Sequence, residues 1–117
     1  MTTAANIAIG FVALLHAYFL VLEMFLWDTP YGRRVFKSTP EFAAASKALA
    51  ANQGLYNGFL AAGLVWGLAL GDAGVHVKVF FLACVVIAGV FGGATASRAI
   101  LFVQAIPGIL ALALLLG

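Results

Sequence analysis

The sequence predicts an all-α integral membrane protein, a four-helix bundle with up-down-up-down topology. Of its 117 residues, 65% are apolar and only 9% are charged, and the mean hydropathy is +1.13. Soluble domains usually carry about 25% charged residues. Charges and turn-forming residues gather in short stretches, and the apolar segments between them approach the roughly 20 residues that cross a membrane. We interpret residues 1–117 as a single transmembrane domain.

The first helix is expected at about residues 4–27. Trp27 falls where an indole favours the membrane interface, because the ring is apolar but its N–H can bond to water. The segment also contains His16 and Glu23, and residues 1–6 contain no basic side chain. These features favour a retained span over a signal peptide.

The second helix is expected at about residues 40–70. Before it, residues 28–39 combine turn formers with three cations. Thr39 suits the N-cap, Pro40 the first helical position and Glu41 the first turn. A helix of this length exceeds the bilayer thickness, so we expect it to extend beyond the bilayer.

The third and fourth helices are expected at about residues 75–93 and 97–116. A short glycine-containing break at residues 71–74 precedes the third helix. Pro107 lies inside the fourth helix, where it removes a backbone donor and clashes with the preceding turn. A kink is therefore expected near residues 103–107.

The cations predict the orientation of the chain. Arg33, Arg34 and Lys37 lie in the first connection and Arg98 near the third, whereas the opposite side has Lys78. Lys and Arg are enriched in cytoplasmic loops. We therefore expect the first and third loops in the cytoplasm and both termini outside.

Polar side chains inside the first two helices are the candidate ligand-binding residues, because hydrocarbon offers them no hydrogen bonds. The set comprises His16, Glu23, Asn52, Gln53, Tyr56 and Asn57. His16 and Glu23 are seven residues apart and share a helix face. Gln53 with Asn57, and Asn52 with Tyr56, are four apart and form two neighbouring stripes.

Two interpretations of these residues stay open. They are either interhelical hydrogen bonds that fix the packing, each contributing about 0.6 to 2 kcal/mol, or the lining of a pocket for a small polar ligand or headgroup. Arg98 likewise has two interpretations, as an interfacial anchor or as a binding group for a carboxylate or phosphate. We expect no metal site, because His76 lies outside the spans and a zinc centre usually needs three protein ligands.

Small residues predict close helix packing and self-association. Gly89 and Gly93 are four residues apart, and Gly63 and Gly67 form a similar pair. Such pairs let helix backbones approach, within one chain or between chains. The expected partners are the lipid bilayer and further copies of the chain, in a homo-oligomer. No nucleic-acid partner is expected.

Two segments resemble an uncharacterised family of short bacterial four-span membrane proteins, a domain of unknown function. They are the runs from His16 to Trp27 and from Asn52 to Phe59. The resemblance covers essentially the whole chain. It implies a bacterial inner-membrane location and no established activity.

A more distant resemblance is to the membrane-associated proteins in eicosanoid and glutathione metabolism, the microsomal glutathione transferase superfamily. The basic segment 33–37, the long second helix with Gln53 to Asn57, and the Arg98-Ala99 pair resemble features of that superfamily. Tyr56 stands where its pattern has glutamate. The resemblance implies a homotrimer that binds glutathione and a lipophile between subunits, near the cytoplasmic face.

We therefore expect a small polytopic membrane protein whose polar pocket binds or acts on a lipophilic or thiol-containing molecule at the cytoplasmic interface. One alternative is an oligomeric transporter or channel subunit with a proton-titratable path through His16 and Glu23. Another is a structural accessory protein without a ligand. The sequence assigns no catalytic residue and no cofactor, and glutathione-transferase-like activity is implied by the resemblance alone.

Overall fold

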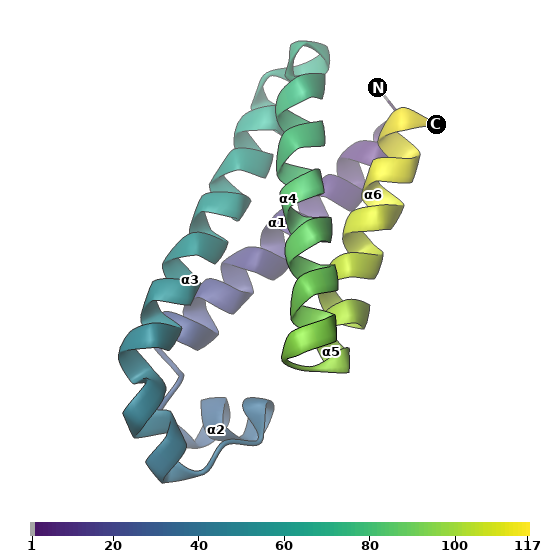
Figure 1. The fold of residues 1–117 in the computed structure, drawn as a ribbon. Helices are drawn as coiled ribbons and strands as arrows, with labels where there is room; N and C mark the ends of the chain where they lie inside the picture. The colour runs from purple at the N-terminus through teal and green to yellow at the C-terminus, as the bar shows by residue number, and fades with distance from the viewer. Residues whose placement is uncertain (1) are drawn as a thin grey trace. The chain divides into compact units, whose positions relative to one another are not determined.

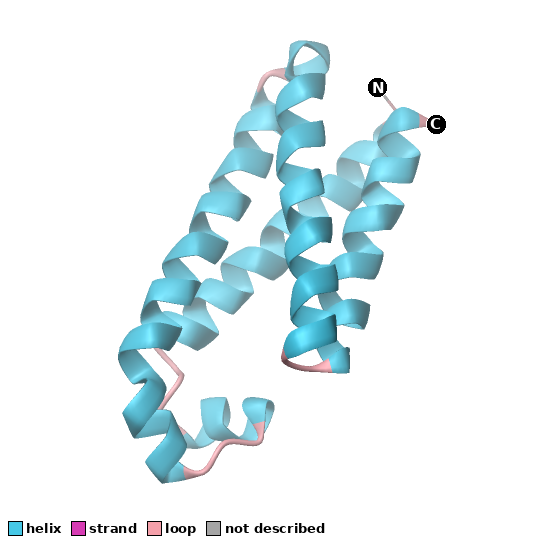
Figure 2. Cartoon of the chain, viewed as in Figure 1, coloured by secondary structure: helices cyan, strands magenta, loops and turns pink. Residues whose placement is uncertain are grey.

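The computed structural model describes residues 2–117, and this part of the chain is helical with short connections and no strand (Figures 1 and 2). The predicted all-α class is confirmed. In chain order the elements are α1 (Thr3–Met24), α2 (Pro30–Phe36), α3 (Pro40–Ala69), the 3₁₀ turn η1 (Gly71–Gly74), α4 (Val75–Thr95), α5 (Arg98–Ile100), the π-helical turn η2 (Leu101–Ala105) and α6 (Ile106–Leu116).

Three helical segments within residues 2–117 are long and apolar enough to cross a membrane. They are Thr3–Met24, Gly71–Thr95 and Arg98–Leu116. These are the lengths and compositions of an integral membrane protein. The 30-residue α3 is not among the three, because its middle contains several amides and a tyrosine. The predicted fourth span and the bundle topology therefore stay predictions.

The connection after α1 contains a helix that the sequence analysis did not expect. The first helix ends at Met24 rather than near residue 27, and α2 begins at Pro30. The hydroxyl of Thr29 accepts a hydrogen bond from the Gly32 N–H at 3.2 Å and donates one to the Leu26 carbonyl at 2.6 Å. An N-cap threonine followed by proline is a favourable helix start.

The last helical segment contains a π-helical turn in the region where a kink was predicted. Ser97 caps α5 by accepting a hydrogen bond from the Ala99 N–H at 3.2 Å. The π turn at Leu101–Ala105 then ends two residues before Pro107. Proline cannot donate to the preceding turn, so the backbone adopts a wider turn there.

The helical chain divides into two compact units, of which the first comprises Met1–Leu14 and Leu60–Gly117. Its core consists of apolar side chains from α1, α3, α4 and α6. The buried members are Ile9, Val12, Ala13, Leu64, Leu82, Val85 and Ala111. Helices α4 and α6 run side by side in this unit (Figure 1).

Close packing in the first unit depends on glycine in α4. A Cβ at Gly89 would lie 2.7 Å from the Ala105 nitrogen and 2.9 Å from its Cα. The contact is therefore between backbones, which is the role expected of small residues in membrane helices. The Gln104 side-chain amide also donates to the Val85 carbonyl at 3.1 Å, so a side chain in the π turn bonds to the backbone of α4.

The second unit comprises Leu15–Phe59 and contains the end of α1, all of α2 and the first part of α3. Here α1 and α3 approach each other at two glycines. A Cβ at Gly54 would lie 2.7 Å from the Met24 Cγ, and one at Gly58 would lie 2.6 Å from the Leu20 Cδ1. Most of the candidate site residues belong to this unit.

Candidate functional site

The centre of the candidate site is a hydrogen bond between α1 and α3. The Asn57 side-chain amide donates to the Glu23 carboxylate oxygen Oε1 at 2.5 Å. Asn57 is buried and Glu23 is partly buried. The structure thus joins two of the residues that the sequence identified, one from each of the first two predicted spans.

Gly54 makes the approach of these two side chains possible. A Cβ at Gly54 would lie 3.1 Å from the Glu23 Cβ and 3.2 Å from the Leu20 carbonyl oxygen. Gly54 lies one helical turn before Asn57, so both face α1. The short α1–α3 separation at Gly54 brings a short asparagine side chain within reach of a carboxylate.

The other three α3 candidates are not brought into this contact. Asn52, Gln53 and Tyr56 are all exposed. Five residues separate Asn52 from Asn57, which places them about 140° apart around the helix. The Tyr56 ring packs edge-on against Phe59, at a centroid distance of 5.8 Å. Gln53 lies one helical turn before Asn57.

His16 lies two turns before Glu23 on α1 and is fully buried. Its imidazole packs edge-on against the Phe19 ring, with the centroids 5.3 Å apart. His16 and Glu23 are seven residues apart, so they share one face of α1. Its surroundings in α1 are aromatic.

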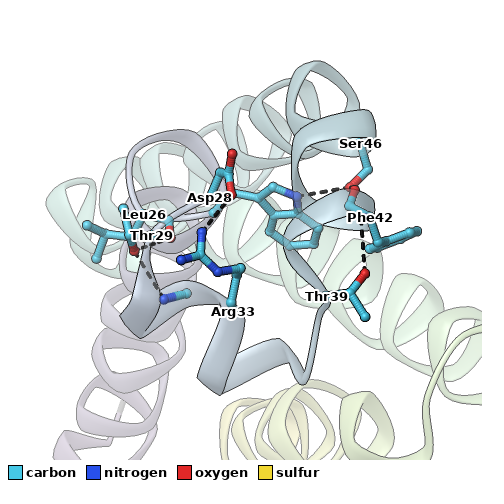
Figure 3. Close-up of polar contacts among 9 residues, drawn as sticks. Leu26, Asp28, Thr29, Arg33, Thr39, Phe42 and Ser46 are labelled. Atoms are coloured by element: carbon cyan, nitrogen blue, oxygen red, sulfur yellow. Dashed lines mark hydrogen bonds and ion pairs between the residues drawn. The ribbon is translucent and has the colours of Figure 1, made fainter.

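Polar and aromatic side chains also gather where α1, α2 and α3 meet in the second unit (Figure 3). The Trp27 indole donates to the Ser46 hydroxyl at 3.0 Å, and its ring lies 4.7 Å from that of Phe36. The Tyr18 and Tyr31 hydroxyls are hydrogen-bonded. These contacts join the turn after α1 to α2 and α3, and they join α2 to α1.

One ion pair stabilises the connection between α1 and α2. Arg33 Nη1 lies 2.7 Å from Asp28 Oδ1, with the two side chains about a quarter exposed. A pair at this exposure contributes about 1 kcal/mol or less. Its main consequence is electrostatic, because it leaves Arg33 largely neutralised.

Arg98 belongs to the first unit, whereas the Glu23–Asn57 pair belongs to the second. Arg98 is exposed at the first position of α5, directly after its Ser97 cap. Both earlier interpretations of this residue, as an anchor or as an anion-binding group, stay open.

Sequence reasoning missed Lys78. This lysine of α4 is fully buried, and its ammonium donates to Asn6 Oδ1 and to the Gly71 carbonyl, both at 3.3 Å. A Cβ at Gly67 would lie 2.8 Å from the Lys78 Cγ. No sequence pattern marked this lysine as buried, because one acceptor is a side chain of α1 and the other is a backbone carbonyl. Lys78 joins α1, the η1 turn and α4.

The donors needed for a metal centre do not come together in the described part of the chain. Within residues 2–117, no group of three or more His, Cys, Asp or Glu side chains is placed to hold a metal ion. The chemistry offered at the Glu23–Asn57 pair is hydrogen bonding by one carboxylate and one amide. This suits a ligand with hydrogen-bond donors.

Comparison with known proteins gives a family match over nearly the whole chain. Residues 10–116 match the family described as "Protein of unknown function (DUF1304)". The chain is also 30% identical over 114 residues to the "Uncharacterized protein YpaA" of Lactococcus lactis subsp. lactis (strain IL1403), covering 96% of each protein. No solved structure matches the chain.

Proposed function

The chain belongs to the DUF1304 family, and we propose that it is an integral membrane protein that binds a small amphiphilic molecule at the Glu23–Asn57 pair. The ligand has a lipophilic body and a polar head that donates hydrogen bonds, such as an amine, a hydroxyl or a thiol. The carboxylate of Glu23 is the acceptor. Catalysis is not required by this proposal.

The observation that supports the proposal is that Asn57 occupies only part of the hydrogen-bond acceptor capacity of Glu23. A carboxylate has about four acceptor positions, and among residues 2–117 the hydrogen bond from Asn57 is the one that Glu23 makes. Ionisable groups in a helix of membrane-spanning length are rare and mark functional sites by default. The unused acceptor capacity of a partly buried carboxylate is therefore available to a ligand.

The residues around the pair fit an amphiphile. Gln53 supplies an exposed amide one turn from Asn57, and Leu20 and Met24 of α1 lie against Gly58 and Gly54, on the side of α1 that faces α3. Ligand sites combine a mostly apolar lining with a few polar groups that fix orientation. The apolar side chains would contact the lipophilic body and the amides its polar head.

The proposal includes a four-span bundle in the bacterial inner membrane, with both termini outside. The connection before α3 and the connection between α4 and α5 would lie in the cytoplasm. Support comes from the cations Arg33, Arg34, Lys37 and Arg98, which lie in or next to these connections. The ligand would then enter from the cytoplasmic interface.

A glutathione-transferase-like activity is the finer form of the proposal. In this form a homotrimer binds glutathione between its subunits, and Arg98 stabilises the thiolate. The basic α2, the long α3 and the position of Arg98 at the start of α5 support it. Tyr56 in place of the superfamily glutamate means that α3 would offer amides and a phenol to glutathione.

Equilibrium dialysis tests the proposal with the protein in lipid nanodiscs and empty nanodiscs as the partition reference. The probes are decylamine, decanol and glutathione. We expect wild type to retain decylamine above the reference, and Glu23→Gln to bind it at least about tenfold more weakly, because an acceptor oxygen is replaced by an amide NH2, which is a donor. Glu41→Gln is the matched control, since Glu41 is exposed in the first turn of α3.

Retention equal to that of empty nanodiscs for all three probes would contradict the proposal and favour a structural role for the pair. Glutathione binding that Arg98→Ala abolishes would support the transferase-like form. Proton flux in proteoliposomes that disappears in His16→Ala would instead favour the transport alternative.

A further inference from the structure

Helix α2 is held firmly against the end of α1. Gly32 is buried, and a Cβ at this position would collide with the Leu26 carbonyl. The Thr29 cap and the Arg33–Asp28 ion pair attach the same short helix to the preceding turn. The side chains of α2 therefore have a fixed arrangement relative to the end of α1.

The three cations of this segment differ in whether a carboxylate lies beside them. Asp28 largely neutralises Arg33. Arg34 and Lys37 are both exposed, and no carboxylate in residues 2–117 lies within ion-pair distance of either. The Arg34 guanidinium lies 5.7 Å from the centre of the Tyr31 ring, which restricts its orientation. Two positive charges are thus available to an external anion.

Lys37 has a backbone conformation that favours glycine. Its φ of 55° and ψ of 40° place it in the left-handed region at the end of α2, where its N–H bonds to the Arg33 carbonyl. Most helices that end this way have glycine there, because the Cβ of any other residue lies too close to the following carbonyl oxygen. An unfavourable backbone conformation is a reason to ask what the side chain does. Here the side chain adds an exposed charge.

Apolar side chains lie among these cations. Tyr31, Val35 and Phe36 of α2 are all exposed, although they are aromatic or branched. Exposed aromatic and aliphatic side chains combined with Lys and Arg are typical of segments that lie in the membrane interface. The charges suit lipid phosphate and the apolar groups suit the acyl boundary.

We propose that α2 together with Lys37 is a binding site for anionic phospholipid, with Arg34 and Lys37 contacting the headgroup phosphate. Val35 and the exposed parts of the Tyr31 and Phe36 rings contact the headgroup–acyl boundary. The occupant is a lipid of the surrounding bilayer. The site is separate from the Glu23–Asn57 pair and does not depend on ligand binding there.

The test uses the full chain, purified in detergent and incubated with phosphatidylglycerol or phosphatidylcholine, with retained lipid measured by native mass spectrometry. Wild type is expected to retain phosphatidylglycerol preferentially. Arg34→Gln and Lys37→Gln are each expected to reduce this preference about fivefold, the factor that corresponds to ~1 kcal/mol per cation. Lys47→Gln is the control, because Lys47 is an exposed lysine of α3 outside the site.

Two variants separate charge from backbone conformation at Lys37. Lys37→Arg should keep the lipid preference. Lys37→Gly should lose it to the same degree as Lys37→Gln while raising the melting temperature, since glycine adopts the left-handed conformation freely. A lower melting temperature in Lys37→Gly would contradict the assignment of charge as the reason for lysine.

The proposal is overturned if wild type retains both lipids equally, or if Lys47→Gln reduces the preference as much as Arg34→Gln. Displacement of phosphatidylglycerol by excess inorganic phosphate would overturn it in favour of a site for free phosphate. Preference that survives added phosphate and is lost in the double variant Arg34→Gln/Lys37→Gln supports the lipid assignment.

Discussion

At the scale of single residues, the Glu23–Asn57 hydrogen bond shows how a polar pair is accommodated between helices rich in apolar side chains. Asn57 is buried, so its amide needs an acceptor, and Glu23 supplies one at 2.5 Å. Membrane helices gain less from such bonds than is often assumed, about 0.6 kcal/mol on average.

The two partners should respond differently to substitution. Asn57→Ala removes the donor and should lower the free energy of unfolding by about 1–2 kcal/mol. Glu23→Gln keeps an acceptor oxygen and should lower it by only about 0.5 kcal/mol. Equilibrium unfolding in mixed detergent micelles measures both, and a double-mutant cycle gives the coupling energy.

The control for this pair is Asn52→Ala. Asn52 is an exposed asparagine of the same helix, so its removal should change the free energy of unfolding by less than about 0.5 kcal/mol. A loss at Asn52 equal to that at Asn57 would contradict the assigned hydrogen bond.

Lys78 should be the more sensitive position. Lys78→Met keeps an unbranched side chain against Gly67 but removes a donor from Asn6 and from the Gly71 carbonyl, so we expect a loss of about 1–3 kcal/mol. Lys78→Ala should lose about 2 kcal/mol more, because it also leaves a cavity. Thermal unfolding in detergent gives the ranking. Lys47→Met, at an exposed lysine, should have the same melting temperature as wild type. A wild-type melting temperature in Lys78→Met would contradict the assigned role of Lys78.

The site was only partly predictable from the sequence. Helical spacing separates Asn57 from Asn52 but does not say which of them faces α1. Gly54 and Gly58 indicate the answer, because small residues favour the side of closest approach. Lys78 could not be recognised as buried from the sequence. One of its acceptors, Asn6, lies on α1, far away in the chain, and the other is the backbone carbonyl of Gly71.

At the scale of helices, the glycines of α1 and α4 have different roles. Gly89 lies against the backbone of Ala105, whereas nothing lies within 4 Å of a Cβ built at Gly10. Gly89→Ala should therefore destabilise the protein by about 1–3 kcal/mol through overpacking. Gly10→Ala should stabilise it by about 0.5–1 kcal/mol, because alanine is the better helix former. Thermal unfolding midpoints measure the direction of both changes. A higher midpoint in Gly89→Ala than in wild type would contradict the close packing of Gly89 against Ala105.

Helix starts could be predicted from the sequence where an N-cap threonine is followed by proline. Thr39-Pro40 predicted the start of α3, and α3 begins at Pro40. The same pair occurs at Thr29-Pro30, where the sequence analysis expected only a connection although α2 begins there. Seven residues are too few to show an apolar period.

Pro107 indicated an irregularity, but the hydrogen-bond pattern of a π turn depends on the packing of α4 against Ala105 and Gln104.

At the scale of the whole molecule, the number of spans depends on whether α3 crosses the bilayer. The three helices that are long and apolar enough do not include it. The side-chain amides of α3 lower the hydropathy of this helix. However, the hydrogen bond to Glu23 would keep one of these amides, that of Asn57, away from lipid. Polar residues in a span are tolerated when they face other helices. We therefore expect α3 to cross.

Single-cysteine labelling distinguishes the two arrangements. Cys84 is the one cysteine of the sequence, so Cys84→Ser provides a cysteine-free background. Into it we place Glu41→Cys, Ala73→Cys and Ala96→Cys, all at exposed positions in or next to the connections. If α3 spans the membrane, an impermeant maleimide should label Ala73→Cys from outside intact cells and leave the other two unlabelled until lysis. If α3 lies on one side, Glu41→Cys and Ala73→Cys should share their labelling, and the Glu23–Asn57 pair would then lie near the interface rather than within the hydrocarbon core.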